Sequence, residues 1–117
     1  MAPRSRPYRS IAGNATAVLA QAGPTVLNSG EIANKSTTDV WLQLYDAAAA
    51  GDVTVGTTTP KHSVFCSLGD GTNYSLRDFY FDDGMEFSLG LVWAVTKELD
   101  AGATNPTSNC AVHFRLS

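Results

Sequence analysis

Residues that could carry chemistry are few in this chain, and their spacing assembles no catalytic or metal centre. His62 and His113 are the only histidines, and each lies in a predicted strand without a second type of metal ligand beside it. A histidine-based metal site needs more than two isolated imidazoles, and no G-x-S-x-G turn presents a nucleophilic serine. We therefore predict that the protein is not an enzyme and binds no metal or other cofactor.

Carboxylates and thiols also have structural interpretations here. Asp82, Asp83 and Glu86 could gather a calcium ion with nearby carbonyl groups, but a turn of solvated carboxylates is much more common. Cys66 and Cys110 each lie on the apolar side of an alternating segment, which favours small buried thiols. A disulfide between them requires that their strands face each other, and the sequence leaves that pairing open.

Composition and charge indicate a single domain with an uneven charge distribution. The 117 residues are 44% hydrophobic and 16% charged, and no run of about 18 apolar residues could span a bilayer. The net charge is −3, but Arg4, Arg6 and Arg9 precede every acidic residue. Residues 11–117 thus hold 5 basic residues against 11 acidic ones, a net charge of −6. We expect neither a nucleic-acid nor a membrane partner for such an acidic body.

Alternating apolar residues predict about eight short strands and no convincing helix. The densest such segment, residues 81–96, is interpreted as a central strand with one face on the core. Asp83 and Gly84 signal a tight reversal within it. Its predicted core residues are Phe87, Leu89, Leu91, Trp93 and Val95.

The remaining strands are predicted at regular spacing, joined by turns and loops. Residues 46–60 are small and form a loop with at most one turn of helix, and Ser29 and Gly30 mark a bulge. This pattern indicates an all-β, jelly-roll-like antiparallel β-sandwich. The other predicted strands are residues 16–21, 25–34, 39–45, 62–68, 74–79 and 111–116.

Residues 1–12 are predicted to form an extended basic N-terminal arm ahead of a sandwich domain that spans residues 13–117. Two prolines oppose regular structure, and no apolar period is present. Either the arm is a disordered tail, or it lies along a neighbouring subunit with arginines on carboxylates. Removal of residues 1–10 is expected to leave folding intact, because no core position is lost. The candidate contact residues of the arm are Arg4, Arg6, Tyr8 and Arg9.

An outward-facing aromatic pair is predicted in residues 39–45. Their alternation places Trp41 and Tyr45 on the face away from the core, roughly 13 Å apart. This pair fits an oligomer interface, a surface that stacks on sugars, or a strand buried on both sides. The sequence leaves all three interpretations open.

Several segments together carry a resemblance to a known group of proteins. They are an opening NATAVLAQAGPTVL, a strand WLQLYD, a loop ending VGTTTP, the segment DGMEFSLGLVWAVT and a final VHFRLS. From residue 16 onward, this layout resembles the jelly-roll capsid decoration, or cement, proteins of tailed bacteriophages and related head-fibre domains. The stretch GDGTNYSLRDFYFDDG departs from the common pattern because it is longer and more aromatic.

The resemblance implies a structural virion protein that is made in the host cytoplasm and is located on the outer capsid surface. It implies that the major capsid protein is the partner, and that neighbouring capsid subunits are bridged. It also implies a homotrimer, in which several weak contacts add up to tight attachment. The alternative function is a carbohydrate- or receptor-binding β-sandwich module of a phage fibre, which would bind a glycan.

Overall fold

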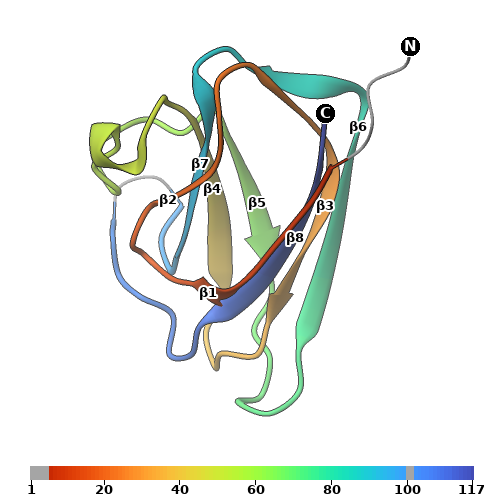
Figure 1. Cartoon of the computed structure of the whole chain (residues 1–117). Helices are drawn as coiled ribbons and strands as arrows, with labels where there is room; N and C mark the ends of the chain where they lie inside the picture. Colours follow the sequence, from red (N-terminus) through yellow and green to blue (C-terminus); the bar gives the residue numbers. More distant parts are fainter. Residues whose placement is uncertain (1–5, 100–101) are drawn as a thin grey trace.

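The computed structural model describes residues 6–99 and 102–117 and confirms the all-β prediction (Figure 1). None of these residues forms a helix that is long and apolar enough to cross a membrane. The described elements are β1 (Arg6–Gly13), β2 (Val18–Ala22), β3 (Thr25–Asn34), β4 (Val40–Asp46), the 3-10 turn η1 (Ala50–Asp52), β5 (His62–Cys66), β6 (Ser75–Phe87), β7 (Gly90–Thr96) and β8 (Cys110–Leu116).

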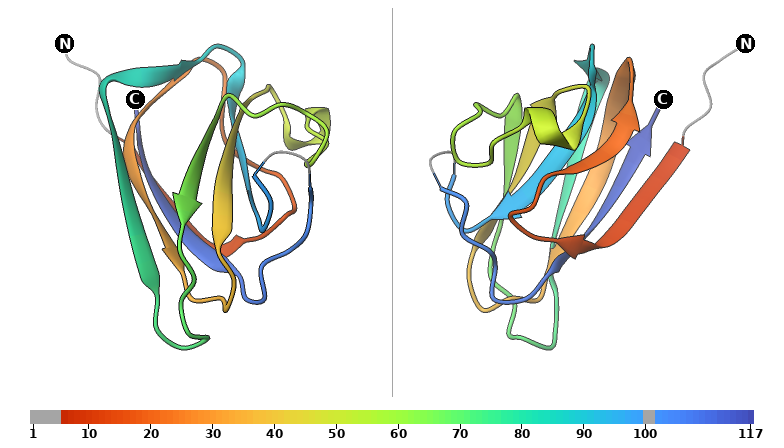
Figure 2. Two further views of the ribbon diagram at one scale, coloured as in Figure 1. Left: turned by 180° about the vertical axis from the view of Figure 1, so that it is seen from behind. Right: turned by 60° about the vertical axis from the view of Figure 1, so that its left-hand side comes forward.

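The strands form two four-stranded antiparallel sheets that pack face to face (Figure 2). One sheet has the order β1-β8-β3-β6 and the other has the order β2-β7-β4-β5. Strands that follow each other in the chain therefore often lie in different sheets, as in the double Greek key of a jelly roll. The predicted jelly-roll-like sandwich is confirmed.

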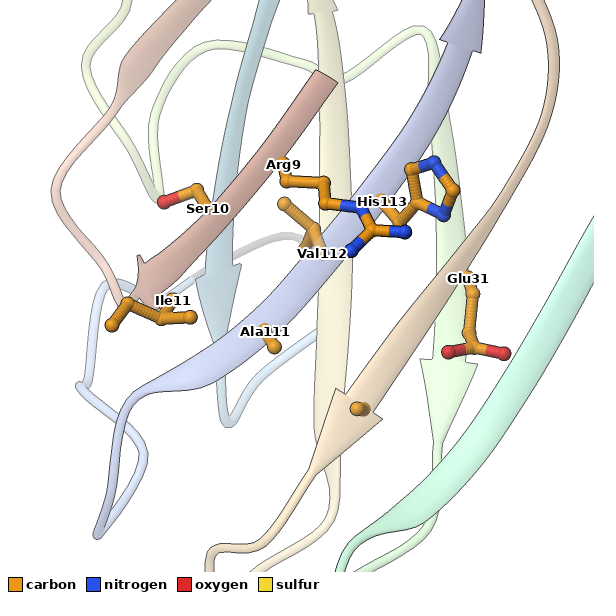
Figure 3. Close-up of a pocket in the computed structure, with 8 residues that line it drawn as sticks. Arg9, Ser10, Ile11, Glu31, Ala111, Val112 and His113 are labelled. Carbon is orange, nitrogen blue, oxygen red and sulfur yellow. The ribbon is translucent and has the colours of Figure 1, made fainter. Parts of the chain in front are cut away.

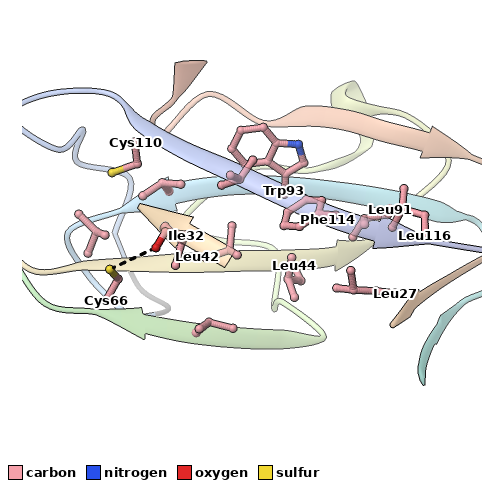
Figure 4. Close-up of a cluster of buried hydrophobic side chains, with 14 of the residues drawn as sticks. Leu27, Ile32, Leu42, Leu44, Cys66, Leu91, Trp93, Cys110, Phe114 and Leu116 are labelled. Atoms are coloured by element: carbon pink, nitrogen blue, oxygen red, sulfur yellow. Dashed lines mark hydrogen bonds between the residues drawn. The ribbon is translucent and has the colours of Figure 1, made fainter. Parts of the chain in front are cut away.

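The main core fills the space between the two sheets (Figure 4). Alternate residues of the facing strands supply it, because successive side chains of a strand point to opposite faces. A second, smaller cluster lies outside the main core and consists of Tyr45, Ala47, Val53, Val92 and Ala94. The largest fully buried side chains include Trp93, Phe87, Phe114, Leu27, Ile32, Leu42, Leu44, Leu91 and Leu116.

The central strand β7 is buried on both faces and not on one. Trp93 lies in the main core as predicted and is fully buried. On the opposite face, Val92 and Ala94 belong to the second cluster, together with Tyr45 of the neighbouring β4. The alternation was therefore read correctly for the inner face, but the sequence did not reveal that the outer face is covered.

The predicted reversal at Asp83 and Gly84 is wrong, because β6 runs through both residues. Residues 81–84 of β6 lie opposite a single residue of β3, Asn28, so the feature is a large, irregular bulge. Gly84 has a φ of +76°, a conformation that glycine adopts without strain. The chain actually reverses at residues 88–89, after β6 ends.

Leu89 lies in this turn and is 57% exposed, which corrects its predicted place in the core. The Asp46 carboxylate closes the turn by accepting hydrogen bonds from the backbone N–H groups of Ser88 (3.0 Å) and Leu89 (2.8 Å). A turn closed in this way leaves the Leu89 side chain on the surface. The predicted inward alternation is therefore correct for Phe87 and for Leu91, Trp93 and Val95, and Leu89 is its exception.

The boundary predicted between an arm (residues 1–12) and a domain that begins at residue 13 is wrong for residues 6–12. These residues belong to β1, which pairs antiparallel with β8 from Arg6, opposite Leu116, to Gly13, opposite Cys110. Pro7 is compatible with this pairing because β1 is an edge strand, where a missing N–H can face away from the sheet. Residues 1–5 lie outside the described part of the chain.

Tyr8 joins β1 to the core. Its ring stacks on Phe114 at 5.7 Å between centroids and meets Trp93 edge-on at 6.2 Å. The Tyr8 hydroxyl also accepts a hydrogen bond of 3.1 Å from the Trp93 indole N–H. Removing residues 1–10 would therefore take away a packed aromatic ring and more than half of the 8 residues of β1, which contradicts the expectation that folding is unaffected.

Candidate interaction surface

The outer face of the β1-β8-β3-β6 sheet carries basic, acidic, imidazole and apolar side chains close together. Alternate residues of β8 enter the core, which leaves Ala111, His113 and Arg115 facing outward. Residues that lie directly opposite each other on paired strands share a face. The register of the four strands therefore identifies the outward residues of β1, β3 and β6.

A row of four charged or titratable residues crosses this face. Arg9 on β1 lies opposite His113 on β8, His113 lies opposite Glu31 on β3, and Glu31 lies opposite Asp78 on β6. Figure 3 shows Arg9 reaching across β8 towards His113, with Glu31 beyond it on β3. From one sheet edge to the other, the row runs from a guanidinium through an imidazole to two carboxylates.

The electrostatics of the row follow from its order. The hydrogen bond with Asp78, partial burial and the charge of Asp78 raise the pKa of Glu31, whereas Arg9 opposes this shift. Partial burial and the charges of Arg9 and Arg115 lower the pKa of His113. Near neutral pH, the row is thus positive at the β1 edge, neutral at His113 and negative towards the β6 edge.

Two further rows flank the charged one and complete what we call the outer-face patch. The first is apolar, and its outer members, Ile11 and Leu76, are 83% and 62% exposed. The second ends at Tyr80, which is 72% exposed. Two shallow hollows lie along the charged row. By register, the flanking rows consist of Ala111, Ala33 and Leu76, and of Pro7, Arg115, Ser29 and Tyr80. Ile11 lies at an irregularity of β1 and extends the apolar row, because it lines the same hollow as Ala111 and Ala33.

The four predicted arm residues fall into three places. Arg6 and Arg9 are exposed on β1, at the edge of the sheet. Tyr8 lies on the opposite face of β1 from Arg9 and points into the core, so its ring is not free to anchor a neighbouring subunit. Arg6 shares the face of Tyr8 but is exposed at the start of the strand. Arg4 lies outside the described residues. A rigid edge strand therefore presents at least two of the three N-terminal arginines.

Of the predicted surface pair on β4, only Trp41 is accessible to a partner, because Tyr45 is buried. Tyr45 is 2% exposed and lies in the second cluster, so the interpretation of a strand buried on both sides is correct at this position. Trp41 is half-buried and meets Phe65 of β5 edge-on at 5.2 Å between centroids. Phe65 is 37% exposed. The surface aromatic pair is therefore Trp41 and Phe65, not Trp41 and Tyr45.

Both cysteines are buried free thiols, as the sequence favoured. Cys66 lies in β5 and Cys110 in β8, so they belong to facing sheets. Burial raises the pKa of Cys66. Burial and the nearby Cys66 raise the pKa of Cys110 to about 12. Thiols that stay protonated near neutral pH are poor nucleophiles, and they serve here as small core side chains.

The remaining chemistry-bearing residues are dispersed. His62 packs edge-on against Phe81 at 5.4 Å between centroids, and it lies in a different sheet from His113. Asp82 and Asp83 are exposed in the bulge of β6. Within residues 6–99 and 102–117, no three histidine, cysteine, aspartate or glutamate residues are grouped so that they could hold a metal ion.

Sequence reasoning missed Glu31, Asp78 and Ile11 as surface residues of interest. The alternation of β8 did place His113 outward, but the residues beside it depend on strand order and register, which no short motif encodes. No protein-family model and no curated protein matches the sequence. The interpretation of the surface therefore depends on its own chemistry.

Proposed function

We propose that this protein is a structural, non-enzymatic virion protein that decorates the outer surface of a phage capsid and bridges neighbouring major capsid protein subunits. Eight-stranded jelly rolls are common in viral capsid domains and in lectins, so the fold agrees with the resemblance in the sequence. Fold alone does not define function. The observation that carries the proposal is the exposed basic edge formed by β1.

The β1 edge suits attachment to an acidic protein surface. Arg6 and Arg9 project from a strand that Tyr8 fastens to the core, so little backbone conformational entropy is lost when they bind. An edge strand also carries backbone groups that can pair with another chain. The major capsid protein would meet this edge through carboxylate side chains, and residues 1–5 would add Arg4 to the contact.

The proposed form on the capsid is a homotrimer. Three copies linked as one rigid body would turn weak single contacts into tight attachment. Trp41 and Phe65 are the aromatic residues on the β4 and β5 surface that a neighbouring subunit could cover. Tyr45 is excluded from such a contact unless the second cluster opens, because its ring is already buried.

Binding to stripped capsids tests this function. We expect the Arg6→Glu variant, and a protein without residues 1–5, to occupy fewer sites than the unmodified protein at low salt. The difference should shrink at high salt, since exposed ion pairs are screened over about 8 Å at physiological ionic strength. Arg77→Glu is the matched control, because Arg77 is an exposed arginine on the opposite edge strand, β6. Equal occupancy by all variants, or no binding of the unmodified protein, contradicts the proposal.

A second candidate function is glycan or receptor binding in a phage fibre, and the Trp41 and Phe65 pair is the observation that favours it. Partly exposed aromatic rings can stack on sugar faces, and jelly rolls also occur in lectins. Retention on a glycan array that is lost in Trp41→Ala, without any binding to capsids, would favour this function over decoration.

A further inference from the structure

The charged row of the outer-face patch is antisymmetric about the middle of the sheet. Arg9 lies on β1 and Asp78 on β6, the two edge strands, while His113 and Glu31 lie on the two central strands. A basic residue and an imidazole thus occupy one half of the row, and two carboxylates occupy the other half. Such an order is complementary to its own reversed copy.

A two-fold axis that runs parallel to the strands reverses the order of the strands in a second copy of the sheet. Neighbouring strands are evenly spaced, about 4.8 Å apart. An axis placed midway between β8 and β3 therefore brings β1 of one copy over β6 of the other, and β8 over β3. Two copies stacked on this axis bring Arg9 of one opposite Asp78 of the other. They also bring His113 opposite Glu31, and each contact occurs twice.

We propose that the outer-face patch docks against the same patch of a second copy of this chain, related by this two-fold axis. An isologous contact needs a surface that complements itself, and the charged row satisfies that condition. Of the three ways to pair these four residues across the axis, one would place the two basic groups opposite each other and the two carboxylates opposite each other, and the observed order avoids it.

The flanking rows satisfy the same condition. The axis brings Ile11 opposite Leu76 in the apolar row, which removes from water two side chains that are 83% and 62% exposed in the single chain. It brings Pro7 opposite Tyr80 in the other row, where the exposed ring would cover the proline. The central positions of both rows carry small or flexible side chains, namely Ala111, Ala33, Ser29 and Arg115. All three rows therefore fit one axis.

The size of the patch sets the expected strength of the contact. Four strands and three rows cover roughly 20 Å by 20 Å on each copy. The total buried area of about 800 Å² is smaller than that of a standard stable interface. Packed sheets also cross at about −30°, which loosens the outermost pairs. We therefore expect a concentration-dependent dimer with a dissociation constant in the micromolar range.

The inference does not depend on the proposed capsid function. It concerns copies of the chain alone and is measured on purified protein. Arg9 belongs to both proposed contacts, but Arg6 lies outside the outer-face patch, so the Arg6→Glu variant tests capsid binding alone. The contact uses the outer face of one sheet, whereas the proposed trimer uses Trp41 and Phe65 on the other. A three-fold association would therefore be unaffected by substitutions in the charged row.

The test is a pair of charge reversals measured by analytical ultracentrifugation from about 1 µM to about 1 mM. Arg9→Asp alone, and Asp78→Arg alone, each place like charges opposite each other twice in the dimer. We expect each to weaken self-association at least tenfold. An equimolar mixture of the two variants restores opposite charges at both contacts, so it should associate as well as the unmodified protein.

The control is a charge reversal at a position outside the outer-face patch. Asp52→Arg makes the same charge change in η1, away from the patch, and should leave association unchanged. Circular dichroism establishes that each variant is folded. Three results would each overturn the inference: an unmodified protein that does not form a two-fold species in this range, single variants that associate normally, or a mixture that fails to associate.

Discussion

β7 and β8 follow each other in the chain and lie in different sheets, and both alternate apolar side chains towards the core. Their outer faces differ in burial. All seven residues of β7 are buried, whereas β8 is buried only at every second position. The outer face of β7 carries Val92 and Ala94, which Tyr45 and Val53 help to cover. The outer face of β8 carries His113 and Arg115 and stays open. At β7 one sheet is therefore covered on both faces, whereas at β8 the outer face of the other sheet is open to solvent.

The largest loss of stability is expected from a substitution in the core between the two sheets, to which both strands contribute. Trp93→Ala should lower the free energy of unfolding by about 3–5 kcal/mol, because Trp93 is fully buried and also donates a hydrogen bond to Tyr8. Leu89→Ala is the control and should change stability by less than about 0.5 kcal/mol, since Leu89 is mostly exposed. Chemical denaturation of both variants measures the difference. Similar losses in the two would show that the burial of β7 is misassigned.

The contrast between the outer faces can be tested with two tyrosines. Tyr45→Ala should cost about 2–4 kcal/mol, since it empties the second cluster. Tyr80→Ala removes the same ring from the outer-face patch and should change stability by less than about 0.5 kcal/mol. Thermal melts at low protein concentration, where no dimer forms, give the comparison. Two equally unstable variants would mean that both outer faces contribute to folding.

A smaller effect is expected at the point where β1 joins the core. Tyr8→Phe keeps the stacked ring but removes the oxygen that accepts the Trp93 N–H. Leaving a buried donor without its partner should cost about 1–2 kcal/mol. Urea denaturation of the variant beside the unmodified protein measures this. An unchanged midpoint would imply that water replaces the hydroxyl and that this hydrogen bond does not stabilise the attachment of β1 to the core.

The smallest effect concerns the turn between β6 and β7 and depends on pH. Burial alone would raise the pKa of Asp46, but hydrogen bonds from the backbone N–H groups of Leu89 and Ser88 lower it. The folded-state pKa is then below the unfolded value of about 4, so the stabilisation is present above that pH and is lost as the pH falls through the folded-state pKa. Asp46→Asn should be less stable than the parent by about 1 kcal/mol near neutral pH, and the gap should close in acid. A constant gap across the pH range would remove the electrostatic explanation.

The sequence predicted the inner architecture well because apolar alternation directly reflects which side chains face the core. The strand at residues 25–34 and the single helical turn in the loop after β4 were both placed correctly. Outer faces were predicted less well. Whether Tyr45 is covered depends on where residues 46–60 fold back, which is a long-range property that local pattern does not contain.

Two local signals were misread for identifiable physical reasons. The Asp83 and Gly84 pair is a common hairpin signal, but the positive φ of Gly84 serves a bulge here. The prolines of the N-terminal segment oppose a central strand, yet an edge strand tolerates one. The candidate surface could not have been assembled from the sequence, because the neighbours of His113 are set by the order β1-β8-β3-β6.

Cryo-electron microscopy of the phage particle tests the central proposal most directly. We expect jelly-roll density on the outer capsid surface, bridging neighbouring capsid subunits, with the β1 edge and its arginines directed towards the capsid. The same density should be absent from particles that lack this protein. Density at a fibre tip instead, or a capsid surface that is identical with and without the protein, would contradict the account.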